Sequence, residues 1–327
     1  MRAVAPAWPP DLHRLTGPTE LLRSHWEAEP FVATGLGGFD DVFGPAVVER
    51  LLRGGGLPLP SVRLFRDGAE LPTKGLARRR ERGSAAREPL VDAAAVDRAV
   101  TAGATLVLEE VQTYCPAVAD LCAELTAETG CRTYSAAFLT PADAHGVAPH
   151  YDTASVLLRQ VHGSKRWRIG PPRDRWPVQE WARGRETDVA REPLLDVVLR
   201  AGECLYIPRG FTHVGTATDQ ASIHLSVGLK PLTWGMIVRQ LLAEQLDEEP
   251  LRECLPYGFH RADPAALADQ AVERTGGLAA RLSQRVADHG VRVDAKRVLD
   301  RLTRPAPPAP AEGSLLAALT HTPEATT

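Results

Sequence analysis

The chain has 327 residues, with 38 basic and 41 acidic side chains and a formal net charge of −3 at pH 7. This length allows one large domain or two small ones, each with a substantial core. The nearly balanced charge gives no electrostatic reason to expect nucleic acid or an anionic membrane as a partner. No apolar run approaches the roughly 18 residues of a membrane span, and the first twenty residues lack the apolar segment of a secretory signal. We therefore expect a cytoplasmic protein.

Cysteine usage excludes two further classes of protein. The five cysteines are an odd number and include no C-x-x-C pair: Cys115, Cys122, Cys131, Cys204 and Cys254. A disulfide framework or a thiolate zinc site is therefore not expected.

Residues 1–103 are expected to form short helices and loops that pack on the domain that follows. A helix is predicted near Thr19 as its N-cap, and another within residues 37–56, where three glycines end it. Residues 74–88 carry six positive and two negative charges. Two interpretations of this stretch stay open: a solvated loop, or a basic rim that helps to dock an acidic or RNA-associated substrate.

The hydrophobic pattern changes its period at residue 131. Before it, a helix (91–103), a strand (104–111) and a helix ended by Gly130 are predicted. After it come short segments rich in β-branched and aromatic residues, which are typical of strands: 133–140, 155–161, 165–170, 196–201, 203–208 and 221–229. Six strands in about 100 residues without a long intervening helix favour a sandwich or barrel, which we place at residues 104–232.

Helical patterns return after Pro231. Helices are predicted at 234–248, 264–290 and 294–302. Their apolar faces exceed what one helical layer over a barrel can cover, so residues 233–303 are predicted to mediate a homodimer. Residues 304–327 are proline-rich at their start and are expected to be a linker and tail.

Three residues of the β region have the side chains of a metal site. Two neutral imidazoles and one carboxylate can occupy one face of an octahedral ion and leave three positions open, as in non-haem Fe(II) oxygenases. His150 and Asp152 are two residues apart, so on a strand they point the same way. The third ligand is predicted to be His213, from another strand 63 residues on (213 − 150).

The sequence around His213 supports this assignment. Gly202, Pro208, Gly210 and His213 fit the pattern G-x5-P-x-G-x2-H, which is the second motif of cupins. Gly202 would make the turn into one strand, and the bend at Pro208–Gly210 would direct His213 inward.

These motifs resemble those of the JmjC-type cupins of the ribosomal oxygenase group. The resemblance runs from about residue 20 to about residue 260 and includes the signature Q-x-x-G-x-K-x-W at Gln160, Gly163, Lys165 and Trp167. It implies a mainly β core with flanking helices, in which a double-stranded β-helix is followed by a C-terminal helical region. It also implies Fe(II), 2-oxoglutarate and O₂ as cofactors and co-substrates, and hydroxylation of protein side chains.

The resemblance further implies that Lys165 binds the distal carboxylate of 2-oxoglutarate, because the family has a basic residue fifteen positions after its first histidine ligand. A buried carboxylate needs a compensating cation, which a lysine supplies as a point charge. Lys165 is one of only four lysines in the chain. The alternative is a hairpin lysine that points into water, in which case Arg159 and Arg166 would be the next candidates.

Three further side chains are candidates for the co-substrate site. Relatives often have an asparagine near the position of Ser135, whose hydroxyl could take its place. His224 and Ser226 share one face of a strand and could line the same site.

Taken together, the sequence predicts a 2-oxoglutarate oxygenase that hydroxylates an amino-acid side chain in a protein or peptide. The alternatives are a hydroxylase of a free amino acid or a natural-product peptide intermediate, and a non-catalytic dimeric cupin that only binds. A cupin isomerase is disfavoured because such proteins usually carry His-x-His and a glutamate in the first motif.

Overall fold

The structure is a computed structural model. It describes residues 10–78, 89–178, 192–245, 248–257, 259–261, 263–289 and 296. The chain divides into two compact units, Met1–Pro231 and Leu232–Thr327. Most of the basic stretch 74–88, the predicted helix 294–302 except residue 296, and the tail 304–327 lie outside the described residues. None of the helices in the described part has the length and apolarity needed to cross a membrane.

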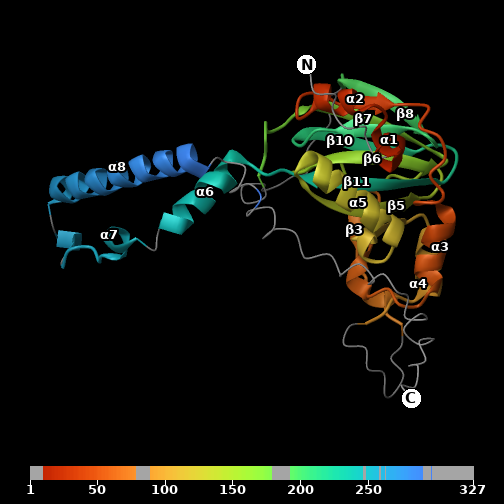
Figure 1. The fold of residues 1–327 in the computed structure, drawn as a ribbon. Helices are drawn as coiled ribbons and strands as arrows, with labels where there is room; N and C mark the ends of the chain where they lie inside the picture. Colours follow the sequence, from red (N-terminus) through yellow and green to blue (C-terminus); the bar gives the residue numbers. More distant parts are fainter. Residues whose placement is uncertain are drawn as a thin grey trace, which may run out of the picture. The chain divides into compact units, whose positions relative to one another are not determined.

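The first unit is built on two antiparallel sheets (Figure 1). The larger sheet has the strand order β1-β9-β6-β11-β5-β4-β2-β3. Its strands are β1 (Phe31–Ala33), β2 (Val62–Arg66), β3 (Ala69–Leu71), β4 (Thr105–Glu109), β5 (Arg132–Thr140), β6 (Ser155–His162), β9 (Cys204–Ile207) and β11 (Ser222–Lys230). The smaller sheet has the order β10-β7-β8, with β7 (Ser164–Pro172), β8 (Leu195–Arg200) and β10 (Phe211–Ala217).

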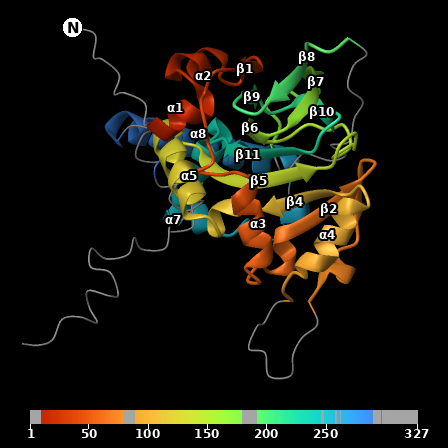
Figure 2. The same cartoon turned by 90° about the vertical axis from the view of Figure 1, so that its right-hand side faces the viewer.

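The two sheets face each other, and Figure 2 shows β7 and β8 near β6 and β9. Both sheets contribute side chains to an apolar inner core: Val156, Leu158, Trp167, Ile169, Leu199, Leu205, Ile207 and Phe211. The predicted β region is therefore confirmed as a cupin-type double sheet, and the six predicted strands lie close to their predicted ranges, whereas β10 was not among them.

Helices cover the opposite face of the large sheet. They are α1 (Pro10–Thr16), α2 (Thr19–His25), α3 (Pro45–Arg53), α4 (Ala93–Thr101) and α5 (Pro116–Thr129), with short 3-10 turns η1 (Leu59–Ser61), η2 (Lys74–Leu76) and η3 (Val111–Thr113). α1, α2 and α5 lie together on one side of the sheet (Figure 2). The predicted stop at Gly130 is confirmed, since this residue caps α5 with a φ of 68°. The predicted start of a helix at or near Thr19 is confirmed, with the adjacent Pro18 as the N-cap of α2.

The N-terminal region differs from the prediction of helices and loops. It contributes β1, β2 and β3 to the large sheet, and β2 pairs with β4. These strands are only three to five residues long. A pattern of period two cannot be recognised in so few residues, so only the pairing partner identifies them as strands.

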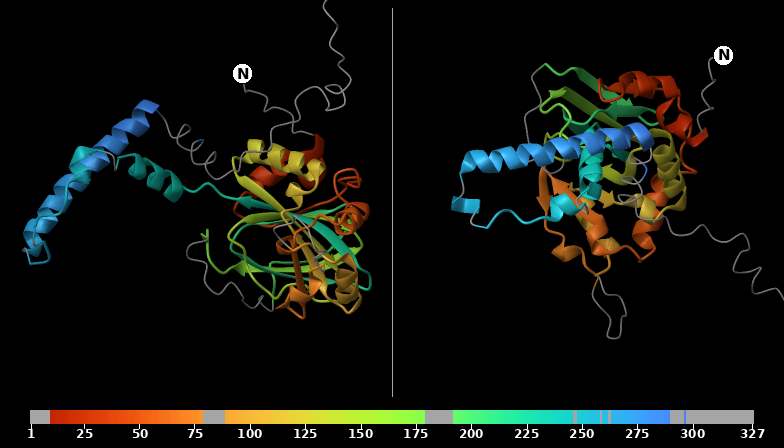
Figure 3. Two further views of the ribbon diagram at one scale, coloured as in Figure 1. Left: turned by 90° about the horizontal axis from the view of Figure 1, so that it is seen from below. Right: turned by 60° about the vertical axis from the view of Figure 1, so that its left-hand side comes forward.

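The second unit contains α6 (Trp234–Gln245), α7 (Glu249–Arg252), the 3-10 turn η4 (Phe259–Arg261) and α8 (Pro264–His289). α6 contacts α8, which is the longest helix in the described part of the chain (Figure 3). Ile237 and Leu241 of α6 are buried against Leu282 and Val286 of α8. The first two predicted C-terminal helices are thereby confirmed.

Candidate active site

His150, Asp152 and His213 lie together. His150 and His213 form an antiparallel bridge in which each backbone N–H donates to the other residue's carbonyl oxygen, at 3.1 and 2.8 Å. Asp152 lies two residues further on, where its carbonyl oxygen accepts from the N–H of Gly210 at 2.8 Å. The segment around His150 is therefore extended and tied to the start of β10 at two points, although it is not the regular strand that was predicted.

The geometry of the three side chains fits a metal ion. One potential ligand atom from each lies within 4.8 Å of the others, and Oδ2 of Asp152 is 3.8 Å from Nε2 of His150 and 3.6 Å from Nε2 of His213. Each Nδ1–H donates to a backbone carbonyl, Ala148 at 2.7 Å and Phe211 at 3.0 Å. Because a carbonyl only accepts, each neutral ring has its lone pair on Nε2, which is the atom that would bind the metal.

The electrostatic environment of His213 also favours its neutral form. Burial, together with the neighbouring His150, lowers the pKa of His213 to about 4, so its imidazole is neutral at physiological pH. Two neutral imidazoles and a carboxylate carry one negative charge and suit a divalent cation.

The bend before His213 is fixed by a buried arginine. Gly210 has a φ of 86°, and a Cβ there would lie 2.0 Å from the carbonyl oxygen of Asp174, so glycine is required. The Arg209 guanidinium donates to Glu27 at 2.5 and 3.2 Å and to the carbonyl oxygen of Pro177 at 3.1 Å. Since Arg209 is 7% exposed, this ion pair anchors the bend in the interior.

Lys165 does not point into water. Its side chain is buried, with 2% of its surface exposed. Nζ donates to Oγ1 of Thr140 at 3.1 Å and lies 5.2 Å from the centre of the Trp167 ring. Burial lowers the pKa of Lys165 to about 7, and no carboxylate among the described residues forms an ion pair with it. Lys165, Thr140, Trp167, His224 and Phe138 form what we call the Lys165 cluster.

The Lys165 cluster contains two buried polar atoms that make no hydrogen bond within the described residues. Nε1 of Trp167 and Nδ1 of His224 are buried without a hydrogen bond within the described part of the protein. Gly215 makes room beside them, because a Cβ there would meet Cε of Lys165 at 2.8 Å. The Trp167 ring also lies 6.2 Å from that of His213 and so joins the cluster to the metal ligands. A buried cation with unpaired polar neighbours fits a ligand carboxylate.

Successive residues of a strand face opposite sides of the sheet, and this alternation decides which of the other candidates lie in the Lys165 cluster. His224 pairs with Phe138 and Ser226 with Ala136 across β11 and β5, and the rings of His224 and Phe138 stack at 4.8 Å. Burial and the nearby Lys165 hold the pKa of His224 well below its usual value. Both His224 and Ser226 therefore occupy the face that carries the cluster.

Ser135 does not reach this face. It pairs with Val227, on the opposite face of the sheet, and its hydroxyl donates to Oε1 of Gln112 at 2.6 Å. Ala136 occupies the inward position next to it, so neither an amide nor a hydroxyl stands there. The prediction of a co-substrate contact from Ser135 is corrected on this physical ground, since adjacent residues of a strand face opposite ways.

The two reserve candidates for the carboxylate anchor lie elsewhere. Arg166 is paired on the surface with Asp196 at 2.7 Å. Arg159 lies on the helix-covered face of β6, opposite to the Lys165 cluster, as its register with Leu225 shows. Sequence reasoning missed Thr140. Residues two apart on a strand share a face, so Thr140 faces the same side of β5 as Phe138, and this alternation is the signal that could have identified it.

The buried lysine predicts how stability depends on pH. In the metal-free and 2-oxoglutarate-free protein, the pKa of Lys165 is about 7 when folded against 10.5 when unfolded. Between these values the unfolded chain binds the proton and the folded chain does not, so raising the pH favours folding. The free energy of unfolding should rise from pH 7 to 10.5 relative to Lys165→Met, by on the order of 4 kcal/mol at most. Urea denaturation of both proteins at several pH values measures this, and a pH-independent difference would contradict it.

Comparisons with known proteins agree with this geometry. Residues 108–237 match the JmjC domain family. The chain is 35% identical over 159 residues to the bifunctional lysine-specific demethylase and histidyl-hydroxylase NO66 of Dictyostelium discoideum, which covers 47% of this chain and 31% of the relative. It is 30% identical over 255 residues to ribosomal oxygenase 1 of Gallus gallus, covering 73% and 39%. The chain thus spans well under half the length of these curated relatives.

Among solved structures, the Escherichia coli ribosomal oxygenase YcfD aligns with a TM-score of 0.53 at 20% identity, covering 86% of this chain and 70% of that one. Another structure of YcfD, with a TM-score of 0.53, contains cobalt and 2-oxoglutarate. At this identity the likeness concerns the fold. Residues 108–237 therefore match the JmjC domain, and the chain has the fold that the ribosomal oxygenase YcfD also has.

Proposed function

We propose that this chain is an Fe(II)- and 2-oxoglutarate-dependent oxygenase that hydroxylates an amino-acid side chain in a protein or peptide. The observation that carries the proposal is the convergence of His150, Asp152 and His213 next to a buried lysine without an acidic partner among the described residues. The JmjC match supports it, as do relatives named histidyl-hydroxylase and ribosomal oxygenase.

Each part of the site has a role in this proposal. His150, Asp152 and His213 would hold Fe(II) through two Nε2 atoms and a carboxylate. When bound together, Fe(II), 2-oxoglutarate and O₂ supply the oxidation that converts a C–H bond to C–OH, with succinate and CO₂ as co-products. Lys165 would bind the distal carboxylate of 2-oxoglutarate, and the Thr140 hydroxyl, 3.1 Å from Nζ, would orient the ammonium group. The stacked rings of Phe138 and His224 would shield this end from water.

The defining experiment is conversion of 2-oxoglutarate to succinate by the full chain with Fe(II). It is run alone, with candidate peptides that include histidine-containing ribosomal sequences, and with free amino acids. Peptide-stimulated turnover supports the proposal, and stimulation by free amino acids alone would indicate the small-molecule hydroxylase. Absence of turnover with bound metal would indicate a binding protein.

Metal binding depends on the three ligands. We expect one Mn(II) or Fe(II) per chain, and His150→Ala, Asp152→Ala or His213→Ala should each weaken binding by more than about 100-fold. The reason is that loss of a group that merely hydrogen-bonds to a metal ligand already costs about 10- to 100-fold. Calorimetric titration with Mn(II) measures this. His145→Ala is the matched control, because this exposed histidine is outside the triad. Full affinity in His213→Ala would mean that the third ligand is misassigned.

Substitution of Lys165 is expected to weaken the binding of 2-oxoglutarate without changing the binding of the metal. Lys165→Met keeps the apolar stem but removes the charge, so the Kd for 2-oxoglutarate in Mn(II)-loaded protein should rise a few hundred-fold while Mn(II) affinity is unchanged. The reason is that breaking a buried pair costs roughly 3–5 kcal/mol. Lys230→Met, at an exposed lysine, is the control. An ordinary Kd in Lys165→Met would place the carboxylate anchor elsewhere.

We further propose a homodimer through the second unit. α6 has two apolar faces: Ile237 and Leu241 are buried against α8, whereas Trp234, Val238 and Leu242 are 74%, 55% and 38% exposed and follow one another at helical spacing. Such an exposed stripe is costly in water and is typical of an interface.

The oligomeric state tests this interface. Light scattering at micromolar concentration should give twice the chain mass of 35.4 kDa, and Val238→Asp should give the monomer, because a carboxylate would have to be desolvated in the interface. Leu194→Asp is the control, since this leucine is also exposed (60%) but lies in the first unit. A monomeric wild type would refute the dimer.

A further inference from the structure

The turn of the N-terminal hairpin consists of Asp67 and Gly68. It joins β2 to β3, and Arg66 pairs with Ala69 on either side of it. The φ angles of Asp67 and Gly68 are 51° and 83°. Positive values at both central residues are those of a type I′ turn, for which Asp-Gly is a preferred sequence. The turn itself therefore requires only a residue that tolerates a positive φ at position 68.

Gly68 also lies against the segment that leads to His150. Its carbonyl oxygen accepts a hydrogen bond from the N–H of Ala148 at 3.3 Å, and it forms a parallel bridge with Val147. A Cβ at position 68 would lie 3.1 Å from Cβ and 3.3 Å from Cα of Ala148. These distances are shorter than ordinary van der Waals contact, so the turn approaches Ala148 this closely only because residue 68 has no side chain.

Ala148 in turn holds a candidate metal ligand. Its carbonyl oxygen accepts from the Nδ1–H of His150 at 2.7 Å. A partner of this kind fixes the orientation of a ligand ring and leaves the lone pair on Nε2. The contacts thus run from Gly68 through Ala148 to the imidazole, and a displacement of Ala148 would move the acceptor of the ring's hydrogen bond.

The segment before His150 needs a support because it departs from β10. His145 forms a bridge with Thr216, and His150 forms the next one with His213. Four residues, 146–149, lie between these two points, whereas only 214 and 215 lie between their partners. The excess forms a bulge, and a bulge beside a site directs a side chain by bending the backbone. The turn at Gly68 is a neighbour that holds this bulge in place.

The same bulge touches the Lys165 cluster. Gly146 is buried, and a Cβ on it would lie 3.4 Å from Nζ of Lys165. The position of the bulge therefore bears on both ends of the candidate site, at His150 through Ala148 and at Lys165 through Gly146.

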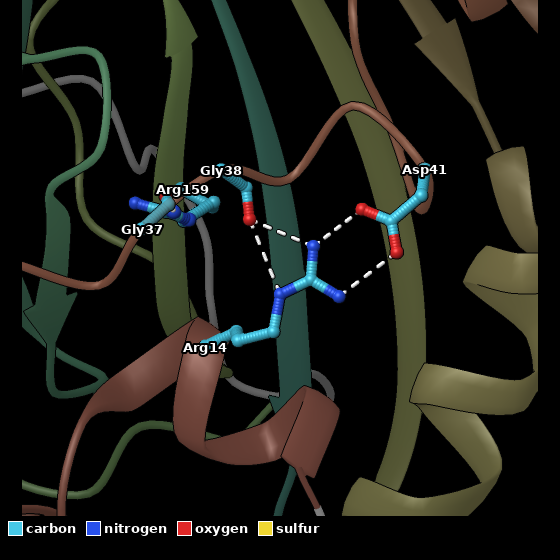
Figure 4. A network of polar contacts seen from close by, with 5 residues as sticks. All are labelled: Arg14, Gly37, Gly38, Asp41 and Arg159. Atoms are coloured by element: carbon cyan, nitrogen blue, oxygen red, sulfur yellow. Dashed lines mark hydrogen bonds and ion pairs between the residues drawn. The ribbon is translucent and has the colours of Figure 1, made fainter.

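Gly37 offers a matched comparison elsewhere in the N-terminal region (Figure 4). It belongs to the loop 35–40, between β1 and α3, and its carbonyl oxygen accepts from Nη2 of Arg159 at 2.6 Å. Like Gly68 it has a positive φ, of 74°, but a Cβ at position 37 would meet nothing within 4 Å. Arg159 lies on the helix-covered face of β6, so this contact is on the face opposite to the Lys165 cluster.

We infer that Gly68 is a positioning residue for His150: its turn holds Ala148, whose carbonyl oxygen keeps the His150 ring in the orientation and tautomer that leave Nε2 free for a metal. The inference rests on the proposed function for the role of His150 as a ligand, whereas the hydrogen bond to Ala148 is present without the metal. A side chain at position 68 would displace Ala148 and release the ring, without altering any of the three ligands.

Gly68→Asn tests this contact, because asparagine tolerates a positive φ but adds the Cβ that meets Ala148. The Kd for Mn(II), measured by calorimetric titration of the full chain, should rise about 10- to 100-fold, as for loss of a group that hydrogen-bonds to a metal ligand. Gly37→Asn should leave the Kd unchanged, since it makes the same substitution at a similar φ in open space.

A second readout needs no metal. Nitrogen NMR spectra of the histidine rings report which ring nitrogen carries the proton, and His150→Ala identifies the signal of His150. The metal-free wild type should show the Nδ1–H form of His150, and Gly68→Asn a mixture of both tautomers. A role of Gly68 in stability alone would lower the unfolding temperature without changing this spectrum.

Ala148→Val keeps the test decisive if Gly68→Asn does not fold. It adds bulk to the same contact from the other side, at a residue without a positive φ, and should change the Kd and the spectrum in the same way. The inference is overturned if the folded variants keep the wild-type Kd and the Nδ1–H form, or if Gly37→Asn weakens Mn(II) binding as much. A wild type that binds no Mn(II), but whose His150 changes tautomer in Gly68→Asn, would contradict the proposed function and support the inference.

Discussion

His150 and His213 exchange both of their backbone hydrogen bonds, at 3.1 and 2.8 Å, although 63 residues separate them. An antiparallel pair of this kind sets the two Cα atoms opposite each other, so the side chains emerge side by side. The position of Asp152 is held by the further bond from Gly210. Because the backbone brings the three groups together, the site does not rely on the attraction of an ion to form.

On its other side, β10 pairs with β7 and so connects His213 to the Lys165 cluster. The register of this pair sets Gly215 opposite Trp167 and Ala217 opposite Lys165. The absence of a side chain at Gly215 leaves space that Lys165 and Trp167 fill. His213 and Lys165 are thus on paired strands of one hydrogen-bonded sheet, and their separation is set by strand register rather than by flexible side chains.

Both faces of the large sheet are buried, and this gives the fold two separate interiors. On β11, Leu225 and Val227 pack under the helices, while His224 and Ser226 face the smaller sheet. On β6 the same alternation sends Arg159 to one side and Leu158 to the other. Each interior contains one cation without an acidic partner among the described residues. A protein that keeps such groups loses stability, because a buried charge without a partner is desolvated and not compensated.

Much of the architecture could be predicted from the sequence, because it depends on local periodicity and on short motifs. The change to strands at residue 131, the helix ended by Gly130 and the long helix of the second unit follow from patterns within single segments. The three candidate metal ligands could be proposed from the sequence because their motifs include the glycines and the proline that bend the backbone around them.

What only the tertiary structure decided is which face each residue occupies and what lies opposite to it. The register of β5 against β11 directs Ser135 towards Gln112 and places Thr140 beside Lys165. The burial of Arg159 under the loop 35–40 depends on contacts with residues more than 100 positions away, such as Gly37. A sequence specifies side chains and local backbone preference, but the partner of a buried charge and the direction of a strand face are properties of the packed sheets, and a shift of one residue reverses them.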